Sequence, residues 1–118
     1  MRADRYNEIL AKQLTLNQQS WVALEGRGVT PQTLLRLDFS YNADSRAAAE
    51  ALTSLMKDQT DYDVRMVVSG SIFRRNWRVE GTTQKTALSL EILDQWVTWM
   101  VTAGKECTCD FDGWGTDI

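Results

Sequence analysis

Acidic residues near the C-terminus are the first candidates for chemistry in this sequence. Asp110, Asp112 and Asp117 lie close together, and carboxylates at such spacing could hold a divalent cation or act as an acid–base pair. A calcium loop starting at Asp110 is excluded, because its glycine comes too early and its last acidic position lies beyond the chain. Two interpretations remain open: a looser magnesium site, or acids that keep an edge strand soluble. We expect no bound metal.

Two glycines enclose a tryptophan in the segment Gly113-Trp114-Gly115. The segment is not a phosphate-binding loop, since no GxGxxG pattern is completed and no Lys-Ser/Thr pair follows. The glycines instead predict a turn with positive φ that places the aromatic ring. The ring of Trp114 could close the end of the core, or it could anchor a partner at the surface, a role in which tryptophan is enriched. The sequence leaves both alternatives open.

Histidine is absent from the chain. This excludes imidazole acid–base catalysis, Ser-His and Cys-His nucleophile pairs, and every metal site that needs imidazole. The cysteines, Cys107 and Cys109, are too few for a disulfide framework, and a bridge between such near neighbours would be strained. We expect both to be reduced apolar fillers on one face of a strand in a cytoplasmic protein. The composition favours binding over catalysis, without a cofactor.

The overall composition is that of one globular domain, 1–118. The chain has 118 residues, of which 43% are hydrophobic and 25% charged, which is enough for one core. The net charge of −3 argues against a general binder of phosphate backbones. No apolar stretch approaches the length of a membrane span, and no signal peptide is expected.

Hydrophobic periodicity predicts the elements that must position these residues. Residues 1–28 are expected to hold an N-terminal helix, at about residues 3–25, which Gly26 and Gly28 end. The predicted elements that follow are a strand at 33–41, a helix at 47–56 with possible caps in 42–45, strands at 62–68 and 73–80 around a turn at 69–71, a helix capped by Ser89, and a strand at 107–111.

This order, a helix followed by β-α-β-β-α-β, is that of the split βαβ unit. Right-handed crossovers place both later helices on one face of the sheet. We therefore predict an α+β fold: a ferredoxin-like βαββαβ two-layer sandwich over residues 33–116, with a four-stranded antiparallel sheet, two helices on one face and an additional N-terminal helix.

Strand alternation also predicts the open face of the sheet. RNA-binding sheets of this kind expose aromatic side chains on which bases stack, and no such side chains are expected here. The face should instead carry balanced ion pairs, so we expect no direct contact with nucleic acid, unless a bulge shifts the alternation. The charged residues predicted there are Arg36, Arg65, Arg74, Arg78, Asp38, Asp63, Glu80 and Asp110. The aromatic residues predicted on the core face are Phe39, Tyr41, Tyr62, Phe73, Trp77 and Phe111.

Trp96 and Trp99 lie three positions apart on the last predicted helix and share a face. With Trp21 they could fill the core, or they could form an apolar stripe for a homodimer or another partner. The core interpretation is favoured, because a chain of this size needs large side chains inside.

The C-terminal third resembles the regulator of ribonuclease E activity B family. The resemblance is carried by the capped helix that begins near Ala87-Leu88-Ser89 and by the ending Asp110-Phe111-Asp112-Gly113-Trp114-Gly115-Thr116. Leu37-Asp38-Phe39-Ser40-Tyr41, entering an alanine-rich helix capped by Asp44, is similar to the first strand and helix of the family. Tyr62-Asp63-Val64 matches its next strand, with Asp61 in place of a glycine. The similarity covers most of residues 33–116.

The resemblance implies a ferredoxin-like fold without catalysis. The founding members are cytoplasmic regulators that bind ribonuclease E and lower its activity by protein contact. They are strongly acidic and carry an acidic tail after the motif, which this sequence lacks. The leading hypothesis is thus a non-catalytic, protein-binding regulator, and the alternative is a self-associating or small-ligand-binding module. A metal-dependent hydrolase ranks third. The predicted partner-binding residues are Asp110, Asp112, Gly113, Trp114, Gly115 and Asp117.

Overall fold

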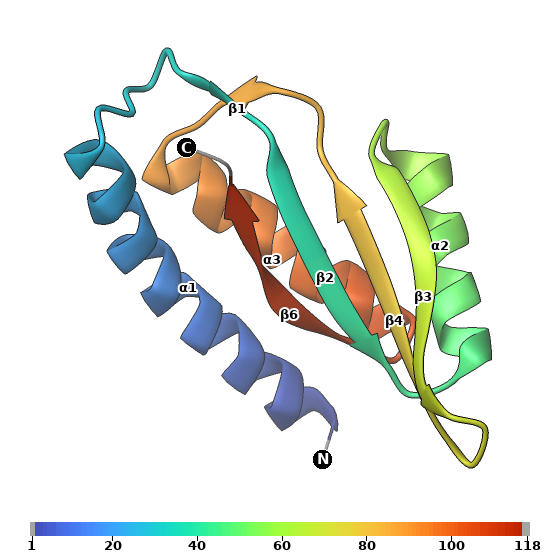
Figure 1. The fold of residues 1–118 in the computed structure, drawn as a ribbon. Coiled ribbons are helices and arrows are strands. Elements are labelled where there is room, and N and C mark those ends of the chain that lie inside the picture. Colours follow the sequence, from blue (N-terminus) through green and yellow to red (C-terminus); the bar gives the residue numbers. More distant parts are fainter. Residues whose placement is uncertain (1, 117–118) are drawn as a thin grey trace.

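The structure, a computed structural model, describes residues 2–116 and has an α+β architecture (Figure 1). This confirms the predicted fold class. The elements in chain order are α1 (Arg2–Gly26), β1 (Leu34–Leu35), β2 (Leu37–Ala43), α2 (Arg46–Gln59), β3 (Asp63–Ser71), β4 (Arg74–Thr82), β5 (Thr86–Ala87), α3 (Leu90–Glu106) and β6 (Cys109–Thr116). None of the helices within these residues is long and apolar enough to cross a membrane.

Residues 2–116 form two antiparallel sheets. The larger sheet has the strand order β3-β4-β2-β6, and the smaller one pairs β1 with β5. The small sheet was not predicted, because the sequence shows one alternating run over 33–41 and gives no sign that the chain leaves the main sheet at Arg36. Leu37, Phe39 and Tyr41 of β2 are buried as predicted, while Asp38 between them is exposed.

The β3–β4 hairpin differs from the prediction in the position of its turn. The glycine suggested a turn at 69–71, but β3 continues through Ser71 and the chain reverses at Ile72 and Phe73. Gly70 lies within the ladder with φ +91°, opposite Arg75. Placing Phe73 in the core was therefore wrong: in the turn its side chain is 92% exposed.

The helices begin at side-chain caps, as their sequences suggest. The Ser89 hydroxyl accepts a hydrogen bond from the Ile92 amide at 3.1 Å and caps α3 as predicted. For α2 the cap is Ser45, which accepts from the Ala48 amide at 3.1 Å, and not Asp44.

The main core lies between the sheet and the helices α2 and α3. On its α2 side the buried residues are Ala48, Ala49, Leu52 and Met56, and the two alanines let the helix pack closely on the strands. Helix α1 packs against α3 and runs beside β6, at one edge of the sheet (Figure 1). A second apolar cluster, which includes Trp21, Leu24 and Leu93, lies between α1 and α3.

The tryptophans on α3 do not share one role. Trp96 is partly buried, packs against both clusters and contacts the ring of Phe39 with centroids 6.3 Å apart. Trp21 is buried on α1. The core interpretation is confirmed for these two and is wrong for Trp99, which is 36% exposed, because it lies at the margin of the buried stripe of α3.

Gly104 allows α3 to lie directly on β2 and β6. A Cβ at this position would lie 2.6 Å from the Cys109 carbonyl oxygen and 2.8 Å from a ring carbon of Tyr41. Tyr41 is fully buried, and its hydroxyl donates a 2.7 Å hydrogen bond to the Met100 carbonyl. Burial raises the pKa of Tyr41 well above its usual value.

The two cysteines occupy different elements, contrary to the prediction that they share a strand face. Cys107 is the C-cap that follows α3, Thr108 takes a positive φ of 55°, and Cys109 begins β6. The helix therefore extends further than the alternating pattern suggested. Both thiols are free, and Cys109 is fully buried. Burial raises the pKa of the Cys109 thiol to about 12.

The buried thiol gives a prediction for the Cys107→Ser variant, in which Cys109 is the remaining cysteine. At about pH 8 a thiol reagent should modify this variant slowly when folded and rapidly in denaturant. Folding holds Cys109 neutral up to about pH 12, whereas an ordinary thiol ionises near 9.0. Its stabilising contribution is therefore complete below about pH 9 and is lost as the pH rises towards 12. Rapid labelling of the folded variant would contradict the burial.

Candidate functional site

A β-bulge in β6 determines how the predicted partner-binding segment is displayed. Phe111 lies opposite Tyr41 and Gly113 opposite Ser40, so Asp112 is an extra residue between them. Gly113 has φ +132°, which confirms a positive φ at this glycine. The predicted turn is wrong, since the chain stays in the strand through residue 116 and the bulge takes up the irregular backbone.

The bulge directs Trp114 towards the helices. Trp114 lies opposite Phe39, is partly buried and packs against both apolar clusters. Its indole Nε1–H donates a 2.8 Å hydrogen bond to Oδ1 of Asn17, which is fully buried on α1. Nδ2 of Asn17 in turn donates to Oδ1 of Asp94 on α3 at 3.0 Å. The ring of Trp114 therefore closes the core where α1, α3 and β6 meet.

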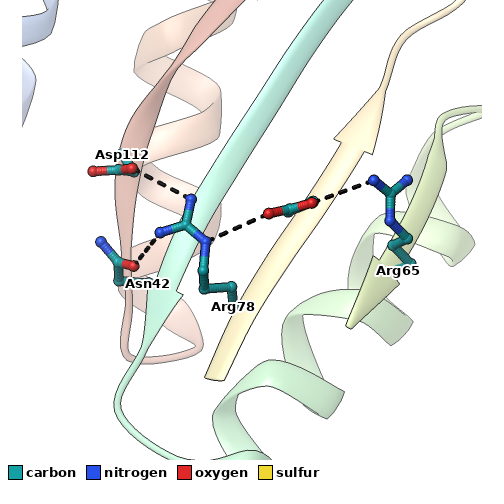
Figure 2. A network of polar contacts seen from close by, with 5 residues as sticks. Asn42, Arg65, Arg78 and Asp112 are labelled. Carbon is teal, nitrogen blue, oxygen red and sulfur yellow. Dashed lines mark hydrogen bonds and ion pairs between the residues drawn. The ribbon is translucent and has the colours of Figure 1, made fainter. Parts of the chain in front are cut away.

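Charged side chains form a network across the open face of the sheet (Figure 2). The Arg78 guanidinium donates to Asn42 Oδ1 at 2.7 Å, to Asp112 Oδ2 at 3.4 Å and to Glu80 Oε2 at 3.5 Å. Arg65 donates to the other Glu80 oxygen at 3.2 Å. The predicted placement of Arg65, Arg78 and Glu80 on this face is confirmed.

This network determines the charge of the open sheet face but contributes little to the stability of the fold. The side chains of Arg78 and Glu80 are 28% and 32% exposed, and those of Arg65 and Asp112 are more exposed. Solvent-screened pairs of this kind contribute at most about 1 kcal/mol each. Two guanidinium groups face two carboxylates, so this part of the sheet carries no basic excess that would attract a phosphate backbone.

A hollow of about 580 Å³ lies on this face, beside the network. The space is open because Ser40 has a small side chain and Gly115 has none; a Cβ at Gly115 would meet nothing within 4 Å. The Thr82 hydroxyl donates a 2.9 Å hydrogen bond to Asp38 at its margin. The hollow is lined in part by Asp38, Ser40, Thr82 and residues 112–115.

The other predicted site residues lie elsewhere. Asp110 pairs with Arg5 of α1 in a neighbouring groove of about 290 Å³, which Asp112 also lines. Asp117 lies outside the described residues. The structure thus brings Asp112, Gly113, Trp114 and Gly115 together and places Asp110 next to them.

The acids are arranged for ion pairs with arginines. Asp110 faces Arg5 and Asp112 faces Arg78, so the two carboxylates do not converge on a common point. Across residues 2–116, no cluster of three or more Cys, Asp or Glu side chains is placed to hold a metal ion.

Asn17 is the residue of this region that sequence reasoning missed. It contacts Trp114 across 97 positions of sequence, and nothing in the local pattern indicates such a pairing. An asparagine within the apolar stripe of the helix was the available signal, since a buried amide needs partners.

Comparison with known families gives a match over most of the chain. The sequence profile of the family described as regulator of ribonuclease activity B matches residues 15–116, from the middle of α1 to the last residue of β6. No curated protein matches the chain at a significant level.

Proposed function

The chain belongs to the regulator of ribonuclease activity B family, whose profile covers residues 15–116, and from this membership we propose that it is a non-catalytic regulator that binds a ribonuclease, with ribonuclease E as the first candidate. The proposed regulator works in the cytoplasm, where its two free cysteines remain reduced. It acts by protein contact and has no contact with RNA of its own.

The topology supports a ferredoxin-like framework for this activity. The strand order β3-β4-β2-β6 is antiparallel throughout, and α2 and α3 pack on one face. We treat residues 1–118 as one domain, in which 33–116 form this framework and 1–28 add a helix beside β6. Such a fold supports many functions, so the proposal depends on the site.

The observation that carries the proposed binding surface is the display of Asp112 by the bulge. Bulges often re-aim a side chain next to a functional site, and this one sets an exposed carboxylate at the rim of the open hollow. Charges at the rim of an interface mainly accelerate association with a partner of opposite sign. We propose that Asp112 and Asp110 direct a basic segment of the ribonuclease towards residues 113–115.

The direct test is titration into ribonuclease E from the same organism, with binding and cleavage of a model RNA followed together. The expected result is saturable binding and slower cleavage. Absence of binding at tens of micromolar would overturn ribonuclease E as the partner, and the family membership would stand.

The site itself is tested by Asp112→Lys. Reversing this charge should weaken binding by about three- to tenfold, mostly through a slower association rate that depends less on salt. The matched control is Glu106→Lys, which reverses an exposed charge at the end of α3, away from the hollow. Equal losses in the two variants would contradict the assignment of this surface, because they would indicate a general effect of net charge.

A further inference from the structure

The two edges of the main sheet differ in what lies beside them. Helix α1 runs along β6, whereas β3 pairs with β4 on one side and, within residues 2–116, has no strand on its other side. An edge strand presents unpaired backbone groups, and natural sequences usually protect it with charges, proline or a covering element. Residues 66–73 contain neither a charge nor a proline. The second half of β3 is therefore an unprotected edge.

Apolar side chains gather on the same segment. Val68 is 49% exposed, and Ile72 and Phe73 at the hairpin tip are 78% and 92% exposed. The tip extends past the N-terminal end of α2 (Figure 1). Exposed single apolar residues are ordinary, but three on one edge strand and its turn mark a surface for association.

Charges of opposite sign flank this strand. Asp58, Asp61 and Asp63 are exposed where the chain enters β3. Arg74 and Arg75 are exposed where it leaves the turn. The edge therefore has an acidic end and a basic end, separated by an apolar middle. An antiparallel copy of the same strand would place each end beside its opposite.

We propose that β3 pairs antiparallel with β3 of a second copy of this chain, about a two-fold axis at Val67, and joins the two sheets into one. In this register Met66 lies opposite Val68 of the second copy, and Val67 lies opposite itself. Asp63 lies opposite Ser71, so no like charges meet within the ladder. The exposed Ile72 lies opposite Tyr62 of the second copy, just beyond the end of the ladder.

The surroundings of the β3 edge fit a second copy of this chain. A groove of about 330 Å³ lies between α2 and the first half of β3, lined by Lys57, Val64 and Met66 among others. The groove gives the Val68 side chain of a second copy a place beside Met66. A nucleic acid or an anionic membrane would meet the arginines but also the three aspartates. An antiparallel second copy brings opposite charges together at both ends of the edge.

The first test is the molar mass in solution, measured by light scattering or sedimentation from about 1 to 200 micromolar. We expect a reversible monomer–dimer equilibrium in the intact chain. Val68→Lys should raise the dimer dissociation constant about tenfold or more, because a charge enters the apolar centre. Val22→Lys is the matched control, since Val22 is 68% exposed on α1, and it should leave the dimer unchanged. A monomer at every concentration, or a dimer insensitive to Val68→Lys, would overturn the proposal.

A charge exchange tests the register. Replacing Asp61 and Asp63 with lysine should weaken the dimer, as should replacing Arg74 and Arg75 with aspartate. All four changes in one chain restore opposite charges at both ends and should restore the dimer. Failure of this rescue, with the fold intact by circular dichroism, would rule out the antiparallel register.

A cross-link tests the two-fold position. In the Cys107→Ser background, Val67→Cys should form a covalent dimer on mild oxidation, because the new thiol lies opposite the same thiol of the second copy. Val22→Cys should not. No cross-link at position 67 would place the axis elsewhere and contradict the proposed pairing.

Discussion

Trp114→Ala is expected to lower the free energy of unfolding by about 3 kcal/mol, measured by urea denaturation. The indole ring packs against both apolar clusters, so its removal leaves a gap between α1, α3 and β6. It also leaves Oδ1 of the fully buried Asn17 without its indole donor. The cost of an unpaired buried acceptor adds to the lost packing.

Two further variants separate these contributions. Trp114→Phe keeps an aromatic ring and removes the N–H, and should cost about 1–2 kcal/mol. Trp99→Ala removes a ring that is 36% exposed and should cost less than about 1 kcal/mol. If Trp114→Ala were as stable as the parent and lost only its ribonuclease, Trp114 would be a surface anchor and its packing role would be contradicted.

Gly104→Ala should destabilise the fold by about 2 kcal/mol, despite the better helix propensity of alanine. The added Cβ would lie 2.6 Å from the Cys109 carbonyl oxygen, and that backbone atom cannot rotate away. Helix α3 must then shift off β2 and β6, which strains the hydrogen bond from Tyr41 to the Met100 carbonyl. The midpoint of urea unfolding measures the effect.

Gly26→Ala is the matched control for this prediction. Gly26 is the last residue of α1, and a Cβ there meets nothing within 4 Å. We expect a change within about 0.5 kcal/mol. If Gly104→Ala were equally neutral, the close approach of α3 to the sheet would be contradicted.

The fold class was predictable because hydrophobic period and burial agree over most of the chain. In β2 the alternation of Leu37, Phe39 and Tyr41 with polar residues corresponds to the buried and exposed faces of the strand. The hydroxyl of Ser89 indicated where α3 begins. Local signals of this kind need only neighbours in sequence, so they can be found without the structure.

The turn of the β3–β4 hairpin shows where such signals fail. Gly70 is a strong local indicator of a turn, yet in the structure it lies within the ladder and the chain reverses at Ile72 and Phe73. The pairing of Ser71 with Arg74 fixes the turn. That pairing depends on the register of two strands, which the residues near the glycine do not specify.

The candidate site could be predicted only in part from the sequence, for a similar reason. The motif around Gly113 and Trp114 could be identified, but strict alternation places Trp114 on the face opposite Phe111. The bulge at Asp112 removes this constraint and returns the ring to the helix side. The partners of Trp114 and Asp112, which are Asn17 and Arg78, lie far away in the sequence.

The position of α1 has a consequence for growth by strand addition. A sheet with two bare edges can add copies at both and polymerise without limit, as in amyloid. Here α1 lies along β6, tied to it by the hydrogen bond between Asn17 and Trp114. Strand addition can then proceed at β3 alone and ends when two copies have met. The N-terminal helix thereby limits this assembly to two copies. A variant in which α1 no longer covers β6 should form fibres.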